Sequence, residues 1–192
     1  MVRRWASEGK FSIRTAYRAL HQASHPKPGR GLIWESWASL RIKLLLWLAL
    51  RRRHWTTDRQ RRHGLETHDN CFLYDQEPES IDHIIVDCSY SKQVWWCIRS
   101  ALRETQQLVP ANSTIDWWNV WREHWTRQCR NGADSIFALV AWELWKERNA
   151  RRLRGASTQV PGLLKLIKYE AESWVQAGMK NLDCLLRRVI EQ

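Results

Sequence analysis

The amino-acid sequence predicts a mainly α-helical domain with a short β-hairpin near its N-terminus. Apolar residues recur at helical spacing along most of the 192 residues, which indicates amphipathic helices. Fourteen tryptophans, in a chain that is 44% hydrophobic, supply enough apolar area for a core. The segment from Lys10 to Ile13 instead alternates polar and apolar residues after Gly9, which is typical of a strand and predicts the hairpin.

The first half of the chain contains three predicted helices separated by breakers. A helix is expected over 15–20, and the Pro- and Gly-rich stretch 25–31 ends it. A long helical pattern follows over 34–49. A shorter helix begins near residue 57, where threonine and aspartate are both good capping residues, and ends at Gly64.

The second half of the chain also predicts helices, near 91–98, 117–125, 136–151 and 164–189. One of them carries a stripe of aromatic residues, which are Trp117, Trp118, Trp121 and Trp125. We interpret the stripe as core, with an exposed partner-binding face as the alternative. We expect roughly three in four tryptophans of the chain to be buried.

Charge is strong and unevenly distributed. The net charge of +11 and the isoelectric point near 9.9 favour a polyanionic partner, most simply nucleic acid, RNA or DNA. Basic residues gather in 41–63 and again in 146–154, whereas 64–91 contains acidic residues but no Arg or Lys. The acidic stretch would repel phosphate, so we expect it to order or neutralise the neighbouring basic helices by docking on them.

Several functional classes receive no support from the sequence. No apolar run approaches the ~18 residues that a membrane helix needs, and the start of the chain lacks the apolar core of a secretory signal. Five scattered cysteines argue against a disulfide scaffold and predict a reducing, intracellular environment. We find neither a Tyr-x-Asp-Asp polymerase signature nor a spaced carboxylate set for two-metal catalysis, so we expect no enzyme activity.

An ordered series of short motifs covers nearly the whole chain. They are Gly9–Tyr17, Trp34, Trp37, Trp47–Ala49, Thr57–Arg59, Arg62–Gly64, Cys71, Glu79, His83, Cys88, Val94–Trp95, Trp142–Asn149 and Trp174–Gly178. This series resembles the zinc-binding domain that follows reverse transcriptase in plant non-LTR (LINE-type) retrotransposons. The resemblance implies a truncated piece from the C-terminal end of a polyprotein, in which residues 1–109 form the zinc-binding-like domain and 110–192 the helical C-terminal region of the same element.

The resemblance also implies a metal site in a zinc-knuckle-like segment, 68–90. The family pattern is Cys-x-x-Cys, then His, then Cys, and here Cys71, His83 and Cys88 are in place. Tyr74 stands where the pattern has its second cysteine, and a phenol is a poor zinc ligand. Two interpretations stay open: the three residues hold zinc with water or a substitute fourth ligand, or they are a relic that merely packs. The substitutes considered are Asp75, Glu79 and Cys97.

A basic cluster is the candidate nucleic-acid surface, and its members are Arg51, Arg52, Arg53, Trp55, Arg59, Arg61 and Arg62. Arginine grips phosphate with its planar guanidinium, and a free tryptophan stacks on bases. The alternative is an ordinary solvated face. We therefore expect a sequence-tolerant, non-catalytic accessory domain in the nucleus, with a reverse transcriptase core as a further candidate partner, and we weigh against it a structural or protein-interaction remnant.

Overall fold

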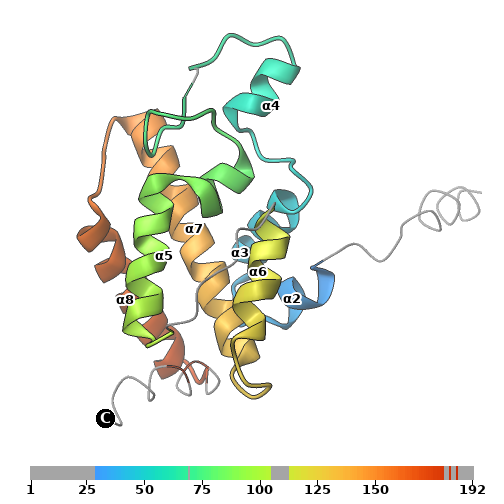
Figure 1. Cartoon of the computed structure of the whole chain (residues 1–192), viewed down its shortest axis with the longest axis vertical. Helices are drawn as coiled ribbons and strands as arrows, with labels where there is room; N and C mark the ends of the chain where they lie inside the picture. The colour runs from blue at the N-terminus through green and yellow to red at the C-terminus, as the bar shows by residue number, and fades with distance from the viewer. Residues whose placement is uncertain (1–28, 69, 105–112, 180–181, 183–184, 186–192) are drawn as a thin grey trace, which may run out of the picture.

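The computed structural model describes residues 29–68, 70–104, 113–179, 182 and 185 (Figure 1). Its elements are α2 (Arg30–Glu35), α3 (Leu40–Ala49), α4 (Thr57–Arg62), the π-helical turn η2 (His83–Asp87), α5 (Ser89–Ala101), α6 (Thr114–Glu123), α7 (Arg130–Arg154) and α8 (Val160–Gln176). The mainly helical prediction is confirmed. Within these ranges the β pairing consists of an isolated antiparallel bridge between Asn70 and Pro78. The predicted N-terminal hairpin lies outside the described residues.

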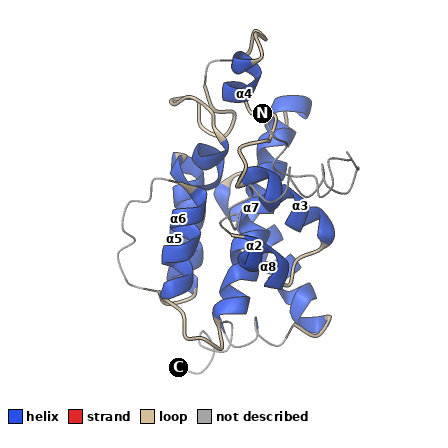
Figure 2. Cartoon of the chain, turned by 90° about the vertical axis from the view of Figure 1, so that its right-hand side faces the viewer, coloured by secondary structure: helices blue, strands red, loops and turns tan. Residues whose placement is uncertain are grey.

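Helix α7 is the central element of the fold. It runs for 25 residues and contacts α2, α3, α6, α8 and η2 (Figures 1 and 2). Nearly every residue from Gly132 to Leu144 is buried, so the helix is enclosed on all sides at its N-terminal end. It ends at Gly155, which adopts φ 62° as a left-handed cap, and basic residues in its last turn suit the helix dipole.

The aromatic stripe of α6 lies in the core against α5 and α7. Trp118 stacks on Phe137 at a centroid distance of 4.3 Å, and Trp95 of α5 lies 4.4 Å from Trp117. Buried indole N–H groups of this core find acceptors: Trp118 Nε1 donates to Asp134 at 2.8 Å, and Trp121 Nε1 donates to the carbonyl of Ala133 at 2.9 Å. The interpretation of this stripe as core is confirmed.

Fewer tryptophans are buried than expected. Among those described, the buried ones are Trp95, Trp117, Trp118, Trp121 and Trp125, the half-buried ones packed against the core are Trp142, Trp145 and Trp174, and the exposed ones are Trp34, Trp37, Trp47, Trp55 and Trp96. Eight of the thirteen described tryptophans therefore pack in or against the core, which is a majority but less than the three in four expected. The reason is local: α3 and the segments beside it are apolar on both sides, whereas α7 covers only one side.

Two further expectations concern the cysteines and the membrane. Cys71, Cys88 and Cys97 are free thiols, but Cys129 is disulfide-bonded, so the expectation of reduced cysteines fails at that position. None of the described helices is long and apolar enough to cross a membrane. The predicted boundary between 109 and 110 lies outside the described residues, and it stays a prediction.

Candidate functional site

Cys71, His83 and Cys88 come together in one buried cluster. One ligand atom from each lies within 4.8 Å of the others, and the two sulfurs are 3.9 Å apart. Both thiols are fully buried and the imidazole is 7% exposed. The π-helical turn η2 explains half of the arrangement, because the N–H of Cys88 donates to the carbonyl of His83 at 2.8 Å and the two residues bracket that turn.

Backbone N–H groups point at both sulfurs. The N–H of Leu73 lies 3.4 Å from the sulfur of Cys71, and the amides of Tyr90 and Ser91 help to lower the pKa of Cys88. The hydrogen bond from Cys71 is the largest cause of that shift, which brings the pKa of Cys88 to about 7 against the effect of burial. The same hydrogen bond, followed by burial, raises the pKa of Cys71. The pair therefore favours one thiolate near neutral pH, and a thiolate is the form that binds metal.

His83 presents one ring nitrogen to the cluster. Its Nδ1 lies 3.2 Å from a carboxylate oxygen of Glu77, and its buried Nε2 has no hydrogen-bond partner among the described residues. Burial acts to lower the pKa of His83, but the neighbouring Cys71 and Glu77 outweigh it and raise that pKa. A carboxylate behind a ligating imidazole is the usual second layer of a metal site. A buried imidazole beside two sulfurs therefore fits a zinc ion.

The described residues near the cluster supply no fourth ligand. Tyr74 is 42% exposed, and the group that can share an ion consists of the same cysteines and histidine, without Asp75, Glu79 or Cys97. Glu79, considered above as a possible substitute ligand, is fully buried and paired with Arg148.

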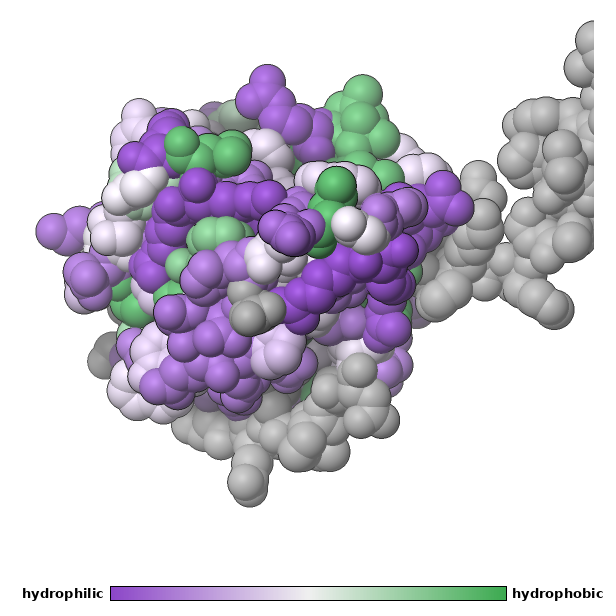
Figure 3. Space-filling view, turned by 90° about the horizontal axis from the view of Figure 1, so that it is seen from above, coloured by the Kyte–Doolittle hydropathy of each residue, from purple (hydrophilic) through white to green (hydrophobic). Residues whose placement is uncertain are grey.

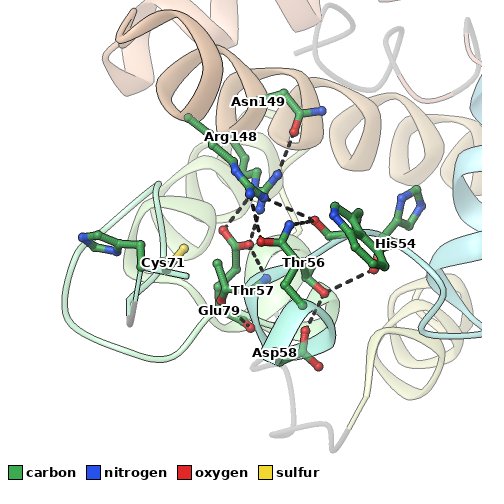
Figure 4. Close-up of polar contacts among 12 residues, drawn as sticks. His54, Thr56, Thr57, Asp58, Cys71, Glu79, Arg148 and Asn149 are labelled. Carbon is green, nitrogen blue, oxygen red and sulfur yellow. Dashed lines mark hydrogen bonds and ion pairs between the residues drawn. The ribbon is translucent and has the colours of Figure 1, made fainter. Parts of the chain in front are cut away.

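Glu79 instead joins residues 71–88, which we call the metal segment, to α4 and α7 (Figure 4). Arg148, 2% exposed, donates through Nε to one oxygen of Glu79 at 2.9 Å and through Nη2 to the other. That second oxygen also accepts the N–H of Thr57 at 3.1 Å, and the Glu79 carbonyl accepts the N–H of Asp58 at 3.3 Å. Two free N–H groups at the start of α4 are thus satisfied by one residue.

Sequence patterns do not indicate this network. They place Arg148 in an exposed basic zone and make Glu79 a possible metal ligand, yet the two residues form a buried ion pair across 69 positions. Local periodicity carries no signal for a partner so far away. The unusual feature in the sequence is a single carboxylate that follows a proline in an otherwise exposed acidic stretch, and that pattern is too common to assign a role.

The predicted basic surface is only partly free. Arg52 pairs with Asp82 of the acidic stretch at 2.9 Å, and Arg62 pairs with Asp58 at 2.7 Å. The Arg52 pair is one contact of the predicted docking of the acidic stretch on the basic helices. Arg53 is exposed and makes no ion pair within the described part of the chain.

Tryptophan rings accompany the remaining arginines of this surface. The guanidinium of Arg51 lies 3.7 Å above the ring of Trp47, and that of Arg59 lies 5.8 Å from the ring of Trp55. Trp55 is 48% exposed, and Arg61 beside it is exposed as well. Figure 3 looks onto this end of the molecule, which is mostly hydrophilic with small hydrophobic patches.

Comparison with known proteins agrees with the motifs. Residues 11–95 match the family described as zinc-binding in reverse transcriptase. An Arabidopsis thaliana protein, provisionally named a ribonuclease H protein, is 25% identical over 188 residues, and the match spans 93% of this chain but 29% of that protein. No solved structure matches the chain. The resemblance stated from the sequence is confirmed over residues 11–95, the segment that matches this family.

Proposed function

We propose that this chain is a non-catalytic, retrotransposon-derived accessory domain that binds nucleic acid in the nucleus without sequence preference. The observation that carries the proposal is the exposed indole of Trp55 among arginines at the α4 end of the molecule. Guanidinium groups attract phosphate, and a half-exposed indole offers a face on which a base stacks. Arg52, Arg53 and Arg61 are exposed cations close to it in sequence.

The exposed ion pairs leave most of this positive charge available. Arg52 and Arg62 have side chains that are 63% and 61% exposed, so their pairs with Asp82 and Asp58 are weak and are screened by salt. A phosphate backbone therefore competes for them at little cost. The buried Glu79–Arg148 pair differs from these exposed pairs, because it is shielded from solvent and keeps α4 in place.

We further propose that Cys71, His83 and Cys88 hold a zinc ion that keeps this end of the molecule ordered. The ion would cross-link the loop at Cys71 to η2. Glu79, which lies between the loop and η2 in the sequence, caps the start of α4. When bound, zinc supplies folding free energy, and its position beside fixed N–H···S contacts suits a structural site. The carboxylate of Glu77 orients His83.

A non-catalytic role fits what the polar groups of this site do. Glu77 contacts the histidine, while Arg148 and the start of α4 engage Glu79, so neither carboxylate is placed as a general base. The ribonuclease H name belongs to a protein of which the chain spans 29%, and it is not carried over. The rival proposal is a structural or protein-interaction remnant with no retained ligand.

The salt dependence of binding tests the proposal. A single-stranded oligonucleotide is titrated with the full chain at several salt concentrations, alongside the triple variant Arg53→Gln, Arg61→Gln and Arg62→Gln. We expect the slope of log K against log salt to fall in magnitude by about 2, because each lost phosphate contact removes roughly 0.7 to 0.9 from it.

The matched control removes the same charge elsewhere. Its three substitutions are at exposed positions outside the α4 end, Arg127→Gln, Lys165→Gln and Lys168→Gln. We expect the control to keep the slope of the parent chain. Equal slopes in both triple variants would mean that binding follows net charge alone, which would favour the remnant.

A further inference from the structure

Helix α3 has a second apolar face that points to solvent. Ile42, Leu45, Leu46 and Ala49 face the core. On the other side Leu40 is 63%, Leu44 46% and Trp47 37% exposed. Single exposed apolar residues are ordinary, but a helix that is apolar on both faces is expected to be enclosed.

The exposed residues follow the spacing of a helix–helix seam. Within α3, Leu44 lies four positions after Leu40 and Trp47 three after that, while Trp37, 49% exposed, lies in the bend before the helix. Alternating steps of three and four residues make up the stripe that packs against a second helix in a coiled coil. We name Trp37, Leu40, Leu44 and Trp47 the α3 seam. It is long enough for about two turns of a partner helix.

A cavity lies at the N-terminal end of the α3 seam. Its volume is about 320 Å³, and its lining residues are Ser36, Trp37, Ala38, Ser39, Lys43 and Trp174. The N–H of Trp37 donates to Ser135 of α7 at 2.7 Å, which fixes the backbone at this rim. A half-open cavity walled by two indoles accepts one bulky apolar side chain, as the central anchor of a protein interface does.

The charge around the α3 seam selects the partner. Residues 36–53 contain five Arg or Lys side chains and no acidic residue. Arg41 and Lys43 flank the seam within α3, and Arg51 lies over the ring of Trp47. A second copy of this face would set like charges against each other, whereas a partner with acidic flanks would pair with them.

We propose that the α3 seam binds an amphipathic helix that has apolar residues at heptad spacing and acidic residues on its flanks. A bulky apolar side chain of that helix enters the cavity beside Lys43. The helix belongs to a separate protein partner. This interface does not depend on nucleic-acid binding at the α4 end.

The test uses two designed helical peptides with leucine at the heptad core positions. One carries glutamate and the other lysine at the flanking positions, and both are titrated by fluorescence anisotropy with the full chain at about 150 mM salt. We expect micromolar binding of the glutamate peptide and at least ~10-fold weaker binding of the lysine peptide. The substitutions Leu40→Arg and Leu44→Arg are each expected to lower the affinity for the glutamate peptide by ~10-fold.

Leu166→Arg is the matched control, because Leu166 is 49% exposed on α8 and outside the α3 seam. It is expected to leave the affinity unchanged, and circular dichroism confirms that the variants fold. Equal binding of the two peptides, or an equal effect of the control, overturns the proposal. Displacement of the peptide by a single-stranded oligonucleotide also overturns it, since the face would then belong to the nucleic-acid surface.

Discussion

The aromatic core around α6 and the metal segment 71–88 are stabilised in different ways. In the core, rings such as Trp118, Trp121 and Phe137 are fully buried and contact one another, so the stabilisation is spread over many apolar contacts. In the metal segment, a few polar links hold the backbone: the buried Glu79–Arg148 pair and the Cys–His–Cys cluster.

The difference predicts how each region tolerates substitution. A core built from many contacts loses stability gradually, and its loss is felt throughout the cooperative unit. A segment held by a few polar groups loses its order when one of them is removed, and the rest of the domain keeps its fold.

The largest expected effect is that of Trp118→Ala in the core. Trp118 is fully buried, stacks on Phe137 at 4.3 Å and donates to Asp134. Its truncation is expected to lower the free energy of unfolding by ~4 kcal/mol. Urea denaturation measures the loss, with Trp96→Ala as control, because Trp96 is 68% exposed and should cost less than ~0.5 kcal/mol. Similar losses in the two variants would contradict an aromatic core at α6.

Arg148→Met tests the polar links of the metal segment. It leaves Glu79 buried without its ionic partner, which is expected to cost ~3 to 4 kcal/mol. Hydrogen exchange should show lost protection in Thr57–Arg62 and around Cys88, with α6 little changed. Adding Glu79→Gln should recover part of the stability, since the unpaired charge is removed. Equal loss of protection in α6 would mean that the two regions form one cooperative unit.

Tyr74→Cys tests whether the metal centre lacks one ligand. We expect one zinc per chain in both proteins by mass spectrometry, with affinity at least ~100-fold higher in the variant. A ~100-fold change corresponds to ~3 kcal/mol, which is about a quarter of the ~10–16 kcal/mol that a complete structural site with four ligands contributes. Competition with a chromophoric chelator measures both affinities, and Phe72→Cys is the control for an added thiol nearby. Zinc in the variant alone would mean that Cys71, His83 and Cys88 are a relic.

The sequence predicts those features that depend on local pattern. Helical spacing locates the stripe at Trp117 and the long helix α7, and the motif series brings Cys71, His83 and Cys88 into one segment. Each of these follows from residues close in sequence or from an ordered resemblance. The physical reason is that periodicity reports which face of an element is apolar.

Features that depend on distant partners are not predictable in this way. Glu79 meets Arg148 across 69 positions, and nothing near either residue indicates the other. The exposed tryptophans are equally hard to predict. Trp37 and Trp47 are large apolar residues of the kind that usually lie in a core, but no helix of the described chain covers them. An apolar residue is buried only if the fold supplies a neighbour for it.

The smallest expected effect is a pH dependence that belongs to the core alone. Asp134 is fully buried, and burial raises its pKa to about 6, although Trp118 and Arg122 act to lower it. Arg122 Nε lies 2.9 Å from Asp134 Oδ2, and this ion pair compensates the burial of Asp134 only in part. Between pH 3.8 and about 6, Asp134 is therefore protonated in the folded state, whereas it has already lost its proton in the unfolded state.

The sign follows from that proton. Because the folded state binds the proton more tightly, the contribution of Asp134 to stability decreases by ~3 kcal/mol in total as pH rises from about 4 through 6, and it is constant above that range. Asp134→Asn cannot titrate, so the difference in unfolding free energy between the two proteins should shift by that amount in favour of the variant. Urea denaturation across this pH range measures it. A difference that is constant with pH would show that Arg122 fully compensates the burial of Asp134 and that the core, like the metal segment, contains a complete ion pair.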